Sequence, residues 1–167
     1  MAGAEPGPRL DELFPDSIGA GKALRARGWS IAVAESCTGG LLGAALTAVP
    51  GSSAYVRGGI IAYDNAIKEE LLAVPSEMLA QYGAVSEQVA RSMAAGARQR
   101  LGAAVAIGIT GVAGPGSAEG GKPAGLVYVA IAAPGVDRVV RLDGDRGRDG
   151  NRAASVRAAL RLLTELR

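Results

Sequence analysis

The sequence predicts an α/β fold in which helices cover both faces of a mixed, mostly parallel sheet, giving a three-layer α/β/α sandwich. Two observations support this prediction. Short apolar runs bounded by glycine alternate with helical patterns through the first two thirds of the chain, as in units with parallel strands. Two later apolar runs meet at Pro134-Gly135, which is typical of an antiparallel hairpin.

The first part of the chain contains five expected elements in the order helix, strand, helix, strand, helix. Gly28 ends the first helix, and Asp64 is a good N-cap for the last one. The two strands are short, apolar and bounded by turn residues. The five elements span residues 11–27, 29–34, 38–50, 54–63 and 64–72.

The second part predicts a short helix that begins at Pro75-Ser76 and a longer one that Ser86 caps. An entirely apolar run follows, and we expect it to be a central strand because both of its faces would be buried. A hairpin and a C-terminal helix complete the chain. The expected elements after residue 74 span residues 75–83, 86–101, 103–110, 126–133, 137–143 and 151–165.

The composition excludes several classes of enzyme. The chain has no histidine and one cysteine, so a Ser-His-Asp triad, a Cys-His pair and an internal disulfide cannot form within it. Zinc sites are disfavoured for the same reason, and we expect neither a metal nor a cofactor. The net charge of +2 and the aromatic content of 4% argue against direct nucleic-acid binding.

The length and the distribution of apolar residues indicate one domain without a membrane span. No apolar run approaches the ~20 residues that a span needs, and the N-terminus lacks the pattern of a signal peptide. We therefore expect a cytoplasmic protein without membrane contact. Residues 1–10 are expected to form a disordered tail, and residues 11–167 a single domain.

The segment Glu35-Ser36-Cys37-Thr38-Gly39-Gly40 follows the first predicted strand and is the strongest candidate for a site. A serine here is commonly a helix cap, but this junction carries two hydroxyls and a thiol. Backbone N–H groups of Thr38, Gly39 and Gly40 suit an oxyanion hole or a phosphate. Ser36 is the preferred nucleophile; Cys37 remains an alternative because a thiol at a helix N-terminus has a lowered pKa.

Without histidine, a serine nucleophile needs another base, and a buried lysine can serve. The chain has three lysines. Lys68 lies one helical turn beyond the second strand and is the best candidate, although its neighbours Glu69 and Glu70 are also compatible with an ordinary surface lysine. Lys22 falls on the first helix and Lys122 in a loop.

The third predicted strand ends at Thr110 and leads into a glycine-rich loop that begins at Gly111. Residues 116–122 match the first seven positions of a phosphate-binding P-loop, but Pro123 replaces the required serine or threonine, which excludes that motif. Near the C-terminus, Arg146 follows a tight turn and Arg152 begins a helix, positions that favour an anionic ligand.

The chain closely resembles the CinA C-terminal domain of the competence/damage-inducible proteins, a family that includes the nicotinamide mononucleotide deamidases (PncC). The resemblance runs from about residue 16 to residue 163. Several blocks in the same order carry it: "AESCTGG" (34–40), "PGSSAYVRGGIIAYDNAIKEELLAV" (50–74), "GAVSEQVARSMAAGA" (83–97), "GITGVAGPG" (108–116), "KPAGLVYVA" (122–130) and "GDR" (144–146). There are two extra residues before Arg152, and the other large CinA domain, a nucleotide pyrophosphatase-like module, has no counterpart here.

The resemblance implies an α/β/α fold and a metal-free hydrolase that converts nicotinamide mononucleotide to nicotinate mononucleotide and ammonia in pyridine nucleotide salvage. Ser36 would be the nucleophile, Lys68 the general base and Thr110 a partner in proton transfer. Arg146 and Arg152 correspond to arginines of the family. In the reaction that we expect from these residues, backbone N–H groups around Thr38, Gly39 and Gly40, or that of Gly111, hold the oxyanion. Tyr63 orients Lys68, and Arg146 and Arg152 hold the 5′-phosphate.

A second reading comes from a different class: a non-enzymatic nucleotide-binding or scaffold domain of a CinA protein. The presence of serine, lysine, threonine and arginine at the matched positions favours the enzyme, since a scaffold would not require them. We expect the small-molecule substrate to be the main partner. The helical surfaces, rich in alanine and glycine, permit a homodimer or a higher homo-oligomer.

Overall fold

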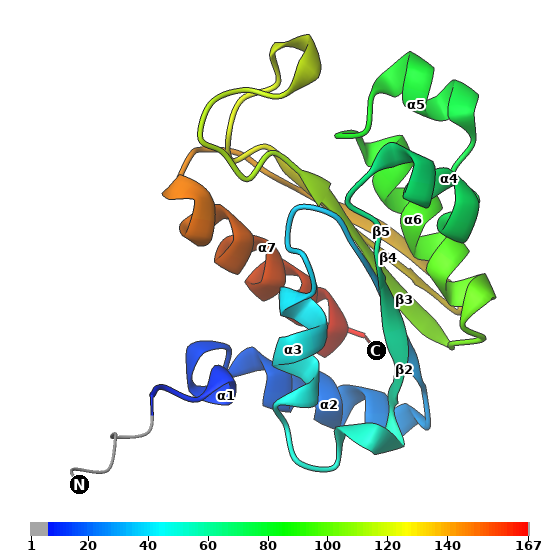
Figure 1. Ribbon diagram of the computed structural model, residues 1–167. Coiled ribbons are helices and arrows are strands. Elements are labelled where there is room, and N and C mark those ends of the chain that lie inside the picture. The colour runs from blue at the N-terminus through cyan, green and yellow to red at the C-terminus, as the bar shows by residue number, and fades with distance from the viewer. Residues whose placement is uncertain (1–6, 167) are drawn as a thin grey trace, which may run out of the picture.

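The computed structural model describes residues 7–166, and its five strands form one sheet between two layers of helices (Figure 1). The strand order is β2-β1-β3-β4-β5. The expected N-terminal tail lies mostly outside the described residues; its last residue, Leu10, already begins the one-turn helix α1 (Leu10–Leu13). The predicted α/β/α sandwich is therefore confirmed.

Pairing within the sheet is mixed, as the sequence predicts. Strand β1 (Ile31–Glu35) pairs in parallel with β2 (Val56–Ile61) and with β3 (Val105–Gly111). Strand β4 (Val127–Ala133) pairs antiparallel with β3, and β5 (Val136–Leu142) pairs antiparallel with β4. Four of the five strands consequently run in the same direction, and only β4 opposes them.

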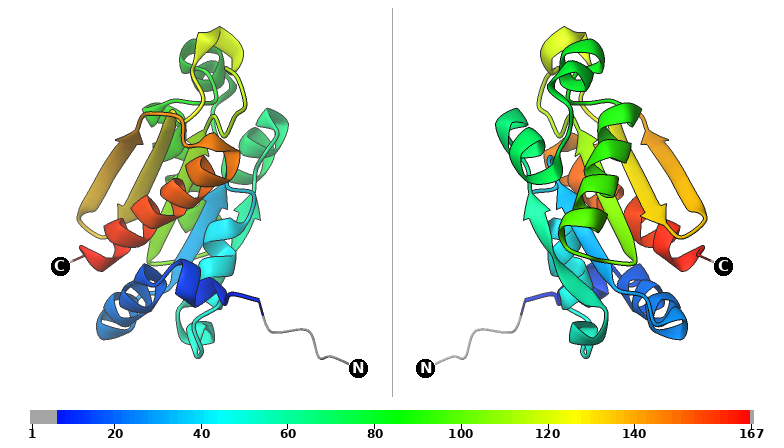
Figure 2. Two further views of the ribbon diagram at one scale, coloured as in Figure 1. Left: turned by 90° about the vertical axis from the view of Figure 1, so that its left-hand side faces the viewer. Right: turned by 90° about the vertical axis from the view of Figure 1, so that its right-hand side faces the viewer.

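Helices cover both faces of the sheet (Figure 2). One face carries α2 (Asp16–Arg27), α3 (Leu41–Thr47) and α7 (Gly147–Thr164), which share the larger apolar core with β1, β3 and β4. The other face carries a smaller, alanine-rich core. The helices on that face are α4 (Asn65–Leu72), α5 (Ser76–Tyr82) and α6 (Glu87–Arg100).

Caps and breaks set the helix boundaries. Asp64 accepts a hydrogen bond from the amide of Ala66, and Ser86 accepts one from Val89, so both predicted caps are confirmed.

The single helix expected over residues 11–27 is wrong, because the chain breaks around Pro15 and Phe14 turns into the core. Helix α7 begins before the expected residue 151. Short 3-10 turns η1 (Ser52–Ala54) and η2 (Glu119–Gly121) lie in two connections.

The carboxyl ends of the three parallel strands lie side by side. Glu35, the last residue of β1, pairs with Ile61 on one side and Ile109 on the other. The segments that follow these residues therefore emerge at one edge of the sheet, which is where open α/β sheets bind ligands. The loop between β3 and β4, which contains η2, also lies at this edge (Figure 1).

Packing between α4 and α6 depends on a glycine. A Cβ atom on Gly96 would overlap the backbone carbonyl of Leu72, so Gly96→Ala forces the two helices apart. We expect this variant to lose ~1–3 kcal/mol in free energy of unfolding, measured by urea denaturation. Ala95→Ser, at an exposed position on the same helix, should change it by less than about 0.5 kcal/mol. Equal stability of the two variants would contradict this account of the packing.

Candidate active site

A cavity of about 300 Å³ opens at the carboxyl edge of the parallel strands. It brings together Ser36 after β1, Tyr63 and Lys68 after β2, and Thr110 and Gly111 at the end of β3. All five were candidates from the sequence. The remaining residues of the wall are Cys37, Asn65, Ala84, Val85, Val112, Ala113, Gly114, Pro115, Ala118 and Arg148.

The turn that carries Ser36 is fixed by the buried carboxylate of Glu35. One carboxylate oxygen accepts hydrogen bonds from the amides of Gly40 (3.2 Å) and Leu42 (3.0 Å), and the other accepts one from Gly43 (2.8 Å). These amides belong to the first turn of α3 or precede it, so the carboxylate satisfies donors that a helix leaves unpaired. Glu35 therefore anchors the turn to the start of α3.

Two of the amides that the sequence assigned to an oxyanion hole are already engaged in hydrogen bonds within this turn. Gly40 donates to Glu35, and Gly39 donates to the carbonyl of Ser36 at 3.1 Å. Gly39 and Gly40 have φ angles of +57° and +99°, so they permit the turn rather than line the cavity. Within residues 7–166, the amide of Thr38 makes no hydrogen bond. That amide and Gly111 are the remaining candidates for donors near Ser36.

Lys68 is almost fully buried, with 1% of its surface exposed. Its ammonium donates to the carbonyl of Tyr63 at 3.0 Å, and no ion pair involves it in the described part of the chain. Burial lowers the pKa of Lys68 below its ordinary value, and the negative charge of Asp64 opposes this only in part. A neutral amine in a cavity with a serine has the properties of a general base.

The hydroxyl of Thr110 donates its hydrogen bond to the backbone and not into the cavity. Its Oγ1 donates to the carbonyl of Ala84 at 2.7 Å. Because its hydroxyl hydrogen is engaged, the Thr110 oxygen is left to act as an acceptor of hydrogen bonds. The sequence correctly brought Thr110 to the cavity, but its hydroxyl hydrogen is already engaged with Ala84.

The environment of Cys37 reverses the expectation of a reactive thiol. Burial, with a smaller contribution from the nearby carboxylate of Glu35, raises the pKa of the Cys37 thiol to about 11. Helix α3 begins only at Leu41, so Cys37 lies outside its first turn. The thiol remains protonated near neutral pH, and this favours Ser36 as the nucleophile.

The arginines expected to hold an anion lie outside the cavity wall. Arg146 is exposed and donates to the carbonyls of Asp143 and Gly144, and Arg152 donates to the carbonyl of Thr38 at 3.0 Å. Arg148 instead lines the cavity, donating to the carbonyl of Gly114 at 2.6 Å and to the hydroxyl of Tyr63 at 3.3 Å.

Asn151, which sequence reasoning missed, positions this arginine segment. Its buried amide accepts from the amide of Arg146 (2.9 Å) and donates to Ala113 (3.0 Å) and Asp145 (2.8 Å). The side chain thereby joins the start of α7 to the loop after β3. Asn151 stands at the start of the helix expected from the sequence and gave no signal for this role, because the partner that links it to the loop after β3, Ala113, is 38 residues away.

Across residues 7–166, no group of three or more histidine, cysteine, aspartate or glutamate side chains is placed to hold a metal ion. No helix in that range is both long and apolar enough to cross a membrane.

Residues 18–167 match the sequence profile of the family described as the CinA C-terminal domain. The chain belongs to this family. It is 51% identical over 138 residues to a CinA-like protein of Gloeobacter violaceus, covering 81% of this chain and 32% of that protein. It is 54% identical over 142 residues to a CinA-like protein of Synechococcus sp. RCC307, covering 84% and 34%. The chain thus spans about a third of the length of these relatives.

Solved structures of the family share the fold over nearly the whole chain. The competence/damage-inducible protein CihA of Agrobacterium tumefaciens is 40% identical with a TM-score of 0.85, and the match covers 96% of each chain. A CinA superfamily protein of Escherichia coli is 34% identical with a TM-score of 0.89, covering 97% of this chain and 95% of that one.

The three hydrogen bonds of Glu35 predict the effect of an isosteric substitution. Glu35→Gln replaces one acceptor oxygen by an NH₂ group that faces amide donors, so unfolding free energy should fall by ~1–3 kcal/mol. Urea denaturation measures this, with Glu69→Gln, at an exposed position on α4, as the matched control. A Glu35→Gln protein as stable as that control would show that the carboxylate does not anchor the turn.

Proposed function

We propose that this chain is an amidohydrolase that converts nicotinamide mononucleotide to nicotinate mononucleotide and ammonia. The observation that carries the proposal is the buried, unpaired Lys68 beside a cavity that also contains Ser36 and Thr110. Burial of an ammonium group without a carboxylate partner is costly, so such a residue is unusual in a protein without a chemical role for it. Membership of the CinA C-terminal domain family is consistent with this function.

In the proposed reaction, neutral Lys68 accepts the hydroxyl proton of Ser36 while the Ser36 oxygen attacks the carboxamide carbon. The amides of Thr38 and Gly111 stabilise the oxyanion of the tetrahedral intermediate. The protonated Lys68 then returns the proton to the leaving nitrogen, ammonia departs, and an ester to Ser36 remains. Water, deprotonated by Lys68, hydrolyses the ester and regenerates the serine.

The neighbours of Lys68 prepare it for this step. A neutral amine has N–H groups to donate and one lone pair to accept a proton. One N–H is directed to the carbonyl of Tyr63, and the lone pairs of Thr110 provide an acceptor in the same cavity. The lone pair of the amine is then left for the Ser36 hydroxyl.

The 5′-phosphate of the substrate needs a cation, and the structure favours Arg148 over the two arginines expected from sequence. Arg148 is the only arginine in the cavity wall formed by the described residues, and two of its hydrogen bonds fix its orientation toward Tyr63 and Gly114. Its remaining N–H donors suit a phosphate. Arg152 instead holds the Thr38 carbonyl and positions the turn, and Arg146 acts on its own loop.

Ammonia release from nicotinamide mononucleotide tests the assignment of roles. Ser36→Ala and Lys68→Met should each lower kcat by on the order of 10³-fold or more, because the nucleophile and its base act as one unit. Cys37→Ala should keep kcat within the same order of magnitude, since its thiol stays protonated. Full activity of Ser36→Ala would refute the mechanism. A wild-type protein that binds the nucleotide without releasing ammonia would support a non-enzymatic binding domain instead.

The lowered pKa of Lys68 predicts how activity and the free energy of unfolding depend on pH. The pKa of Lys68 is lowered in the folded state. At pH values between this pKa and the ordinary pKa of lysine, the unfolded chain therefore binds more protons than the folded chain. The free energy of unfolding consequently rises with pH across that range. Lys68→Met lacks this dependence. Its stability advantage over the wild type, measured by urea denaturation, should therefore shrink as the pH rises. Wild-type kcat/KM should fall with acidification as Lys68 becomes charged; a stability difference independent of pH would oppose the neutral-amine assignment.

A further inference from the structure

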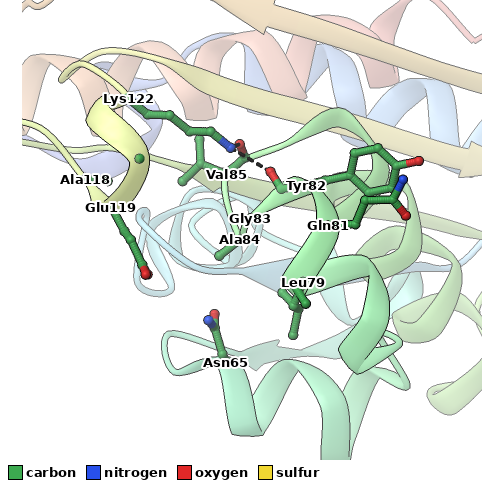
Figure 3. Close-up of a pocket in the computed structure, with 12 residues that line it drawn as sticks. Asn65, Leu79, Gln81, Tyr82, Gly83, Ala84, Val85, Ala118, Glu119 and Lys122 are labelled. Carbon is green, nitrogen blue, oxygen red and sulfur yellow. Dashed lines mark hydrogen bonds between the residues drawn. The ribbon is translucent and has the colours of Figure 1, made fainter.

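A second cavity of about 530 Å³ adjoins the cavity that contains Ser36 (Figure 3). The two share Asn65, Ala84, Val85 and Ala118 in their walls, so they are compartments of one continuous groove. Ligand pockets typically have volumes of roughly 300–1,000 Å³, and the Ser36 compartment alone is at the lower end of that range. A substrate larger than a free carboxamide ring would extend into the second compartment.

The only charged side chains among the described residues that line the second compartment are Glu119 and Lys122. Lys122 donates to the carbonyls of Tyr82 (2.7 Å) and Val85 (2.5 Å), which holds η2 against the connection between α5 and α6. The Lys122 ammonium is therefore engaged by two backbone carbonyls. These two hydrogen bonds fix the position of η2, from which Glu119 projects. The free charge in the second compartment is the carboxylate.

Glu119 and Asn65 face each other across this space. Figure 3 shows the Glu119 carboxylate, from η2, and the Asn65 amide, from the start of α4, pointing toward each other. Within residues 7–166, neither side chain makes a hydrogen bond or an ion pair with the rest of the protein. Two polar groups that converge without protein partners are suited to a ligand with several hydroxyls.

We propose that Glu119 and Asn65 bind the 2′- and 3′-hydroxyls of the substrate's ribose, an inference that rests on the proposed amidohydrolase function. A carboxylate only accepts hydrogen bonds, and vicinal hydroxyls supply two donors for its two oxygens. The Asn65 amide both donates and accepts, so it completes the set. The carboxamide and ring then occupy the Ser36 compartment, the phosphate meets Arg148, and the diol side of the sugar faces η2.

A phosphate in the second compartment fits the observations less well. The carboxylate of Glu119 would repel it, and Lys122 already donates to two carbonyls. A sugar has no charge and gains from an acceptor, as when an acidic residue binds the ribose hydroxyls of a dinucleotide. The polar groups of this compartment therefore select for a ribose rather than for an anion.

The test compares nicotinamide mononucleotide with its 2′-deoxy counterpart. The wild type should prefer the ribose substrate by about tenfold or more in kcat/KM, the value of one hydrogen bond to a charged group. Glu119→Ala should reduce that preference to near unity, mainly through KM for the ribose substrate. Glu69→Ala, an exposed acidic residue on α4 outside both compartments, should keep the wild-type preference.

Two results would overturn the ribose site while leaving the amidohydrolase intact: a wild type that uses both substrates equally, or a Glu119→Ala variant that loses activity equally on both. The latter would assign Glu119 a structural role in its loop. Absence of ammonia from either substrate would overturn the proposed function. Saturation-transfer NMR of the wild type with nicotinamide riboside and its 2′-deoxy form then decides the ribose site separately, and equal or absent binding would refute it.

Discussion

The carboxylate of Glu35 fixes the geometry on which the candidate site depends. It ends a buried strand and accepts three amide hydrogen bonds from the first residues of α3, so strand and helix are joined through one side chain. Charge-assisted hydrogen bonds to helix amides are stronger than neutral ones, and here they are shielded from water. Because Ser36 follows Glu35 directly and its own amide donates to Ile109, the serine is held between two parallel strands at their carboxyl ends.

Burial of Lys68 imposes the second constraint, and the proposed function explains its energetic cost. An amine that is 1% exposed and lacks a carboxylate partner in the described chain destabilises the folded state in its charged form. The fold does not neutralise it with a nearby acid; it supplies one backbone carbonyl, that of Tyr63. In a chain without histidine, desolvating a lysine is a direct way to obtain a base that is unprotonated nearer to neutral pH.

The sequence predicted the fold and the centre of the site because both follow from local patterns. Ser36 directly follows β1, Lys68 lies on the helix that follows β2, and Thr110 is the last residue but one of β3. Parallel strands bring their carboxyl ends together. Arg148 was not selected, since the direction of this arginine in the first turn of α7 depends on distant partners such as Tyr63 and Gly114. The glycine amides of the Ser36 turn are engaged for a related reason that the sequence does not show: the Gly40 amide donates to the Glu35 carboxylate, and the Gly39 amide donates to the carbonyl of Ser36.

Burial shifts both Cys37 and Lys68 toward their uncharged forms. It raises the pKa of the Cys37 thiol and lowers that of the Lys68 ammonium, so a thiolate–ammonium pair is disfavoured from both sides. An alcohol and a neutral amine need no charge separation at rest. In the proposed reaction, charge appears only when the serine attacks, as an oxyanion and an ammonium form together. Amide donors near Ser36 would act on that oxyanion, so the proposed site would stabilise the charged intermediate more than the resting state.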